Sequence, residues 1–337
     1  MPRQPRIEYA GAVYHVMCRG DRRESVFRDD RDYMMFLATL REACGRCGWR
    51  VHAYVLMNNH YHMLLETPEA NLVAGMRWLQ GTYSIRFNVR HRECGHLFQG
   101  RYKALVVSGE GRYFSTVAEY IHLNPGRIKG YEFERRRLED HKWGSYPAYV
   151  NKAKRPEWLC LERVLGRQGL KDAPAGRRRY GLLIRKRLLE MQRSDKGWDL
   201  DEEWSASRRG WCLGGDAFRE EMKELVGVVL KDKRRDSYSG TGVKQHDEWK
   251  AERLIGQGMK ALGLREHDLK EHAKSSAEKY ALAWLVRRRT CVKNAWIKTR
   301  LRMGTATNFS CKLNLVESAG KGDWGYDARH ILDNIRI

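Results

Sequence analysis

Two histidines two residues apart are the first feature of this sequence that is suited to chemistry. His60 and His62 fall in a strand-like stretch, where alternate side chains point to the same side of a sheet. Two neutral imidazoles can hold a divalent metal ion and leave positions open for a phosphate oxygen and for water. A histidine pair of this spacing can also be a packed or surface pair, so it does not establish a metal site by itself.

A tyrosine and an asparagine one helical turn apart form the second feature. Tyr120 and Asn124 stand at i and i+4 of a predicted helix that ends near Pro125, so they share one face. If that helix lies across the face bearing the histidines, a phenol and an amide oxygen reach the same ion. A phenol can attack phosphorus to give a 5′-phosphotyrosine, which conserves the bond energy for rejoining without ATP.

Plainer interpretations of this helix remain open. Tyr120 could be a core tyrosine, and Asn124 could serve only to end the helix. His122 lies between them but projects away from Tyr120 on a helix. We therefore expect His122 to face solvent or DNA.

The elements that would position these residues follow from the hydrophobic pattern. The predicted strands cover residues 12–18, 49–57, 60–66 and 101–107, and the predicted helices cover residues 29–47, 72–92 and 111–123. The dipeptide Asn58-Asn59 separates the second and third strands by a tight turn. The order β-α-β-β-α-β predicts an α+β, ferredoxin-like domain.

The second half of the chain has a helical pattern. A linker is predicted at residues 151–156, and helices at 217–230, 248–262 and 278–289. We predict three regions: a catalytic domain over 1–150, a helical basic accessory region over 151–275, and a helix-turn-helix over 276–337. In the last, helices at 279–289, 295–303 and 308–317 are separated by short breaks. A plain three-helix packing unit is the alternative.

The charge of the chain favours a polyanionic partner. It carries 64 Lys and Arg against 42 Asp and Glu, a net charge of +22, and nucleic acid is the expected partner. Basic and polar residues near the predicted strand ends and the helical breaks are expected to contact DNA, with an ordinary solvated surface as the alternative. These residues are Arg19, Arg22, Arg23, Asn58, Arg101, Lys103, Lys298, Arg300 and Asn308.

Other features bear on compartment and cofactors. The eight cysteines are scattered, no signal peptide is recognised, and no apolar stretch approaches the ~20 residues that span a bilayer. We expect a cytoplasmic, nucleoid-associated protein with reduced thiols and no membrane partner. No phosphate-cradling GxxxxGK[ST] loop is present in the sequence, which argues against the accessory helicase region of a rolling-circle initiator or relaxase.

Four segments, taken together, resemble the HUH single-strand endonucleases, and among these the REP-associated tyrosine transposases. They are GAVYHV at 11–16, VLMNNHYH at 55–62, GHLFQGRYK at 95–103 and YIHLNP at 120–125. The segments occur in the family's order and cover roughly residues 5–150. The sequence departs from the family name at Tyr61, an aromatic residue where the name denotes a hydrophobic one, and we expect Tyr61 to pack inward.

The resemblance implies a site and an activity. His60 and His62 would be the metal-binding pair, Tyr120 the nucleophile and Asn124 the third ligand, with Mg²⁺ or Mn²⁺ as the ion. The expected activity is cleavage and transfer of single-stranded DNA beside a hairpin, by a monomer or a homodimer. A non-catalytic DNA- or RNA-binding regulator is the main alternative. A rolling-circle initiator or relaxase shares the chemistry but usually has larger helicase regions or another motif order.

Overall fold

The computed structural model describes residues 7–110, 112–127, 135–193, 212–231, 241–305 and 308–335. By contacts, the chain divides into two compact units. The N-terminal unit comprises Met1–Cys44 and Gly48–Tyr238, and the C-terminal unit comprises Gly45–Cys47 and Ser239–Ile337. Each unit is described by itself.

The N-terminal unit is built on one sheet with strand order β2-β3-β1-β4-β5. The strands are β1 Ala12–Arg19, β2 Arg50–Met57, β3 His60–Thr67, β4 Lys103–Val107 and β5 Cys212–Leu213. Strand β1 runs antiparallel to both β3 and β4, and β5 pairs with β4 in parallel. The predicted α+β class and the β-α-β-β-α-β order are confirmed, with β5 added at the edge.

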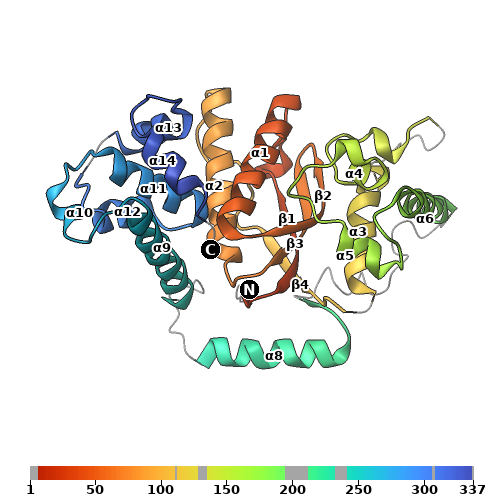
Figure 1. The fold of residues 1–337 in the computed structure, drawn as a ribbon. Coiled ribbons are helices and arrows are strands. Elements are labelled where there is room, and N and C mark those ends of the chain that lie inside the picture. Colours follow the sequence, from red (N-terminus) through yellow and green to blue (C-terminus); the bar gives the residue numbers. More distant parts are fainter. Residues whose placement is uncertain are drawn as a thin grey trace. The chain divides into compact units, whose positions relative to one another are not determined.

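The helices of this unit follow the strands in the predicted order and then continue beyond residue 150. The α-helices are α1 Asp30–Cys47, α2 Leu72–His91, α3 Tyr113–Leu123, α4 Tyr146–Val150, α5 Glu162–Arg167, α6 Pro174–Arg193 and α8 Asp216–Lys231. The 3₁₀ turns are η1 Asp21–Arg23, η2 Asn124–Arg127, η3 Leu138–Asp140 and η4 Lys152–Lys154. Helix α5 packs against α3, and α6 packs against both α3 and α4 within this unit (Figure 1).

Capping and turn residues set the ends of α1 and the turn between β2 and β3. The Asp29 side chain accepts hydrogen bonds from the backbone N–H groups of Arg31 and Asp32, which caps the start of α1. Gly48 ends the helix at φ 66°, a left-handed conformation that glycine adopts without strain. Asn58 and Asn59 then turn the chain from β2 into β3, as the sequence predicts.

The two faces of the sheet are covered by different helices. Tyr61 is fully buried on the face covered by α1 and α2, with its ring centroid 5.0 Å from that of Phe36 and its hydroxyl accepting a hydrogen bond from Gln80. Because side chains alternate along a strand, His60 and His62 point to the opposite face. There α3 contacts β2 and β3 (Figure 1). The inward packing expected for Tyr61 is therefore confirmed.

The outer edge of β2 is covered by the segment that follows α3 and η2. The N–H of Leu56 donates to Trp143 O at 2.9 Å, and the N–H of Ser145 donates to Tyr54 O at 2.8 Å. Farther along, the N–H of Cys160 donates to Val51 O at 2.8 Å. Backbone groups of this edge strand are thus satisfied within the same chain.

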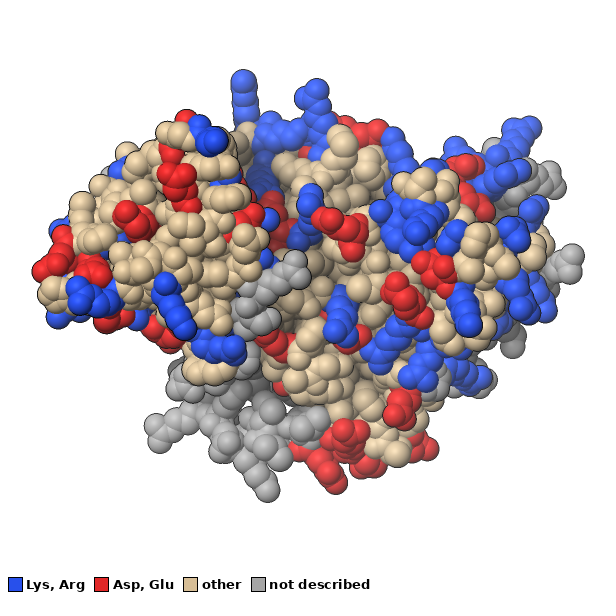
Figure 2. All heavy atoms as spheres, in the orientation of Figure 1, with Lys and Arg blue, Asp and Glu red and all other residues tan. Residues whose placement is uncertain are grey.

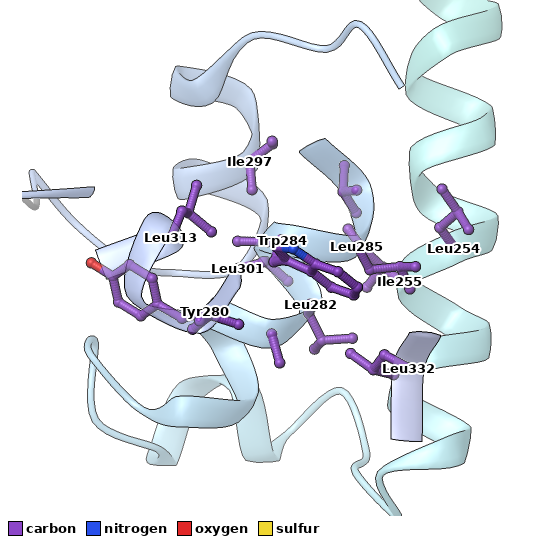
Figure 3. Packing of buried hydrophobic residues seen from close by; sticks show 14 of the residues in the cluster. Leu254, Ile255, Tyr280, Leu282, Trp284, Leu285, Ile297, Leu301, Leu313 and Leu332 are labelled. Carbon is purple, nitrogen blue, oxygen red and sulfur yellow. The ribbon is translucent and has the colours of Figure 1, made fainter. Parts of the chain in front are cut away.

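The C-terminal unit is helical and has its own core. Its helices are α9 Thr241–Ala261, α10 Asp268–Glu271, α11 Ala277–Arg289, α12 Asn294–Arg300, α13 Phe309–Ser318 and α14 Tyr326–Asp333. Buried Leu282, Trp284 and Leu285 of α11 pack with residues that include Leu254 of α9 and Leu332 of α14 (Figure 3). Among the described residues, no helix combines the length and apolarity that crossing a membrane requires.

Candidate functional site

The histidine pair lies on β3, on the sheet face that α3 covers. The ring centroids of His60 and His62 are 5.2 Å apart, and the ring centroid of Tyr120 on α3 is 5.6 Å from that of His62. His62 is buried, whereas His60 and Tyr120 are half-buried. The structure therefore brings the two imidazoles and the phenol of the predicted site together.

Hydrogen bonds orient both imidazoles. His60 Nδ1 is 2.8 Å from Asn59 Oδ1, and the Asn59 amide nitrogen donates to Arg23 O, so the Asn59 oxygen is left to accept from Nδ1–H. This tautomer leaves the lone pair of His60 Nε2 available. His62 Nδ1 is 3.0 Å from His15 Nε2, and a proton on His62 Nδ1 would leave its own Nε2 available too.

Asn124 completes the group of candidate ligands. Helix α3 ends at Leu123, but Asn124 keeps helical angles (φ −55°, ψ −40°) and begins the 3₁₀ turn η2 despite the following Pro125. Its buried side chain hydrogen-bonds with His60. Two imidazole nitrogens and an amide oxygen form a donor set that suits a divalent cation and leaves further positions open.

Burial keeps the imidazoles in the form that binds metal. Desolvation lowers the pKa of His60 to about 4, with the Arg19 charge acting in the same direction and the hydrogen bond with Asn124 opposing it. Burial, together with His15 and His60, holds the pKa of His62 well below its usual value. Both rings are therefore neutral near pH 7, and a neutral ring offers a lone pair.

Two residues of the site were missed in the sequence analysis as chemical groups. His15 on β1 is fully buried, its ring centroid lies 5.8 Å from that of Tyr120, and burial lowers its pKa to about 3. Arg127, at the end of η2, places its guanidinium carbon 4.0 Å from the centroid of the Tyr120 ring. His15 lies within the quoted segment GAVYHV, whereas no periodicity identifies Arg127, which follows Pro125 and Gly126.

The expectation for His122 was wrong. Its ring is 2 % exposed, with Nδ1 2.9 Å from the Tyr180 hydroxyl and Nε2 2.9 Å from the Ser145 hydroxyl. It does point away from Tyr120, but α4 and α6 cover that side of α3. His122 therefore anchors the helix of Tyr120 rather than facing solvent or DNA.

This anchor predicts that the protein loses stability in acid. Burial lowers the pKa of His122 to about 3, against ~6.5 in an unfolded chain. As the pH falls, His122 is protonated in the unfolded state before it is protonated in the folded state. The free energy of unfolding therefore keeps the full contribution of His122 above pH ~6.5, and it falls by about 1.4 kcal/mol per pH unit between pH ~6.5 and pH ~3. Urea unfolding from pH 7.5 to 4.5 should show the decline, with a shallower slope for His122→Gln. An unchanged slope would contradict this role.

The predicted DNA-contacting residues of the N-terminal unit lie around the site. Exposed Arg19 is paired directly with His60 across β1 and β3, and exposed Lys103 is paired with Met17, the partner of His62. Paired residues share a face, so both cations flank the imidazoles. Three more, Arg22, Arg23 and Arg101, are exposed in η1 or just before β4. Asn58 is exposed in the hairpin turn. Their contacts with DNA stay predictions.

The predicted contacts of the C-terminal unit are more varied. Lys298 is half-buried, with Nζ 6.0 Å from the Phe309 ring, and Asn308 is exposed before α13. Arg300 is engaged by two carboxylates, its Nε 2.7 Å from Glu252 and its Nη1 2.7 Å from Glu266. Residues 306 and 307, in the predicted turn between α12 and α13, lie outside the described residues.

Comparisons with known proteins find similarity in the N-terminal region. The family model described as IS200-like transposase matches residues 8–124. None of the curated proteins matches the chain. One solved structure, a REP-associated tyrosine transposase bound to a REP hairpin, is similar at 15% identity and a TM-score of 0.38, covering 48% of this chain and 92% of that one. The matched residues 8–124 contain the histidine pair, Tyr120 and Asn124, so this part of the chain is similar to the IS200-like transposases.

Proposed function

We propose that this protein is a metal-dependent single-strand DNA endonuclease and strand transferase of the REP-associated type. It would act on DNA beside a hairpin through a covalent 5′-phosphotyrosine at Tyr120. The observation that carries the proposal is the meeting of His60, His62, Tyr120 and Asn124 on one sheet face within a transposase-family domain.

The chemistry follows from the residues at the site. The Tyr120 oxygen loses its proton and attacks phosphorus, forming the phosphotyrosine bond as the bond to the 3′ oxygen breaks and that oxygen takes up a proton. Attack of a 3′-hydroxyl on the phosphotyrosine reverses these changes and rejoins DNA. His60, His62 and Asn124 would hold Mg²⁺ or Mn²⁺, which, when bound, polarises the scissile phosphate. Arg19 and Lys103 would bind the flanking phosphates.

End-labelled DNA tests the reaction directly. A hairpin with single-stranded flanks, chosen from palindromes beside the gene, is incubated with the full chain and Mn²⁺ and run on a denaturing gel. A label on the 3′ end should move with the protein, and a label on the 5′ end should be released. Binding without any adduct on every hairpin tried, and without metal dependence, would instead favour the non-catalytic regulator.

Arg127 should support the attack by Tyr120. The attraction between a cation and an aromatic ring is worth about 0.5–2 kcal/mol, so Arg127 would hold the Tyr120 ring in place. Its positive charge would also partly neutralise the negative charge of the phosphate. We expect Arg127→Gln to slow single-turnover adduct formation about tenfold, which corresponds to ~1.4 kcal/mol. Arg127→Lys should be intermediate, because lysine keeps the charge without the planar stacking group.

Measurements of metal and hairpin binding distinguish an effect of Arg127 on the reaction from an effect on binding. Mn²⁺ affinity and hairpin affinity should stay within about twofold of the native protein for both Arg127 variants. Added guanidinium ion should partly restore the rate of an Arg127→Ala variant. An unchanged rate in Arg127→Gln would show that the contact with Tyr120 has no part in the reaction.

The C-terminal unit is proposed to add affinity for DNA through a helix-turn-helix formed by α12 and α13. The support is the basic and polar character of Lys298 and Asn308 at the ends facing the break between these helices. Substituting both residues, Lys298→Gln with Asn308→Ala, should weaken hairpin binding. Unchanged affinity would favour a packing role for these helices.

A further inference from the structure

We propose that the outer face of α6 binds the phosphate backbone of the duplex stem of the hairpin substrate. The inference rests on the proposed function and adds a surface outside the family-matched residues 8–124, because α6 covers Pro174–Arg193. Its two faces have separate roles: the inner face holds the helix and turn of the candidate site, and the outer face is cationic.

The inner face of α6 packs against the candidate site's own elements. The buried Tyr180 hydroxyl meets His122 Nδ1 at 2.9 Å, and Arg187 Nε lies 3.4 Å from Glu119, the residue before Tyr120. Near the C-terminal end of α6, Leu188 meets η2 so closely that a Cβ added to Gly126 would lie 2.7 Å from it. The helix is therefore fixed beside both Tyr120 and Arg127.

The outer face of α6 is rich in exposed cations. Arg178, Arg179 and Arg185 are exposed. Arg185 lies two turns beyond Arg178 on the same side of the helix, and Arg179 is about a quarter-turn around from Arg178, so none of the three lies on the buried stripe. No ion pair between described residues involves any of these three arginines. Lys186 extends the row, 79% exposed and 3.8 Å from Glu190. Figure 2 shows Lys and Arg gathered over the part of the N-terminal unit that contains α4 and α6.

This distribution fits a rigid polyanion better than a membrane. The apolar stripe of α6, which includes Tyr180, Ile184 and Leu188, is buried in the protein and is not available for insertion into lipid. The exposed Leu182 and Leu189 lie on the outer face two helical turns apart, about 10 Å, with Arg185 and Lys186 between them in the sequence. Guanidinium groups along about two helical turns, roughly 10 Å, match several phosphates spaced at about 3.4 Å per strand.

The proposal is tested by measuring the binding of two DNA probes in the absence of divalent metal, so that cleavage does not affect the measured affinity. The probes are a fluorescent DNA hairpin with a single-stranded flank and the same flank as an oligonucleotide without the stem. For Arg178→Gln, Arg179→Gln and Arg185→Gln combined, we expect hairpin affinity to fall at least tenfold at low salt. The slope of log affinity against log salt should become shallower by roughly 3. Affinity for the stemless oligonucleotide should stay within about twofold.

A matched control separates a binding surface from general loss of positive charge. Arg31, Arg41 and Arg77 are exposed on α1 and α2, across the sheet from Tyr120. Changing these three to Gln removes the same charge and should leave hairpin affinity nearly unchanged. Equal losses from both triple variants, or equal losses for both probes, would overturn the proposal. Unchanged thermal melting of both variants verifies folding, and adduct formation, measured separately at saturating hairpin, reports on the chemistry at Tyr120.

Discussion

Replacing Tyr120 with phenylalanine should abolish the covalent protein–DNA adduct and lower the cleavage rate by at least about three orders of magnitude. The substitution removes only the attacking oxygen, and the ring can keep its contacts with His15, His62 and Arg127. Folding and DNA binding should therefore be preserved. The measurement is single-turnover cleavage of the labelled hairpin with Mn²⁺, read on a denaturing gel.

Tyr113→Phe is the matched control for this experiment. Tyr113 lies on the same helix α3, is half-buried like Tyr120, and has no place among the candidate ligands. Its variant should form the adduct at the native rate. An adduct that persists in Tyr120→Phe would identify another nucleophile, and the proposed mechanism would then be wrong.

Replacing His62 with glutamine should weaken Mn²⁺ binding at least about 100-fold. Mutating a residue that only hydrogen-bonds to a metal-binding histidine commonly lowers the metal affinity 10- to 100-fold. Removing a histidine that binds the metal itself should lower the affinity at least as much. His60→Gln should behave in the same way, because its Nε2 is left available by the bond from Nδ1 to Asn59. Titration calorimetry of the metal-free protein with Mn²⁺ measures the effect independently of cleavage.

The exposed His96 supplies the control for the metal experiment. His96→Gln should bind Mn²⁺ like the native protein and should cleave at the native rate. If His62→Gln also retained native Mn²⁺ affinity, the metal would be held elsewhere. The proposed roles of His60 and Asn124 as its ligands would then have to be abandoned.

Much of the domain was predictable because local patterns dominate in it. Alternation along the stretch His60–Thr67 predicts correctly that both imidazoles face one side and Tyr61 the other, and the turn dipeptide before it fixes the hairpin register. The i, i+4 spacing likewise predicts that Tyr120 and Asn124 share a face. Their meeting on one sheet face needs only the packing of α3 against β2 and β3.

The rest of the site depends on contacts that no local pattern contains. His15 supports His62 across 47 residues of sequence, a contact created by the pairing of β1 with β3. Arg127 reaches Tyr120 because the chain continues as a 3₁₀ turn after Asn124 instead of leaving the helix at Pro125. His122 has the sequence environment of a surface histidine, and only the later helices α4 and α6 bury it.

The hydrogen bonds that cover β2 have a practical consequence for anyone isolating residues 8–124 alone. A chain shortened to residue 124 would keep both imidazoles and Tyr120 but would lose Trp143, Ser145 and Cys160 from the flank of β2. The bare strand would then present unpaired N–H and C=O groups along an apolar ribbon, a template for pairing with other molecules. Self-association of such a fragment would result from the exposed edge of β2 and would not be evidence for a native oligomer.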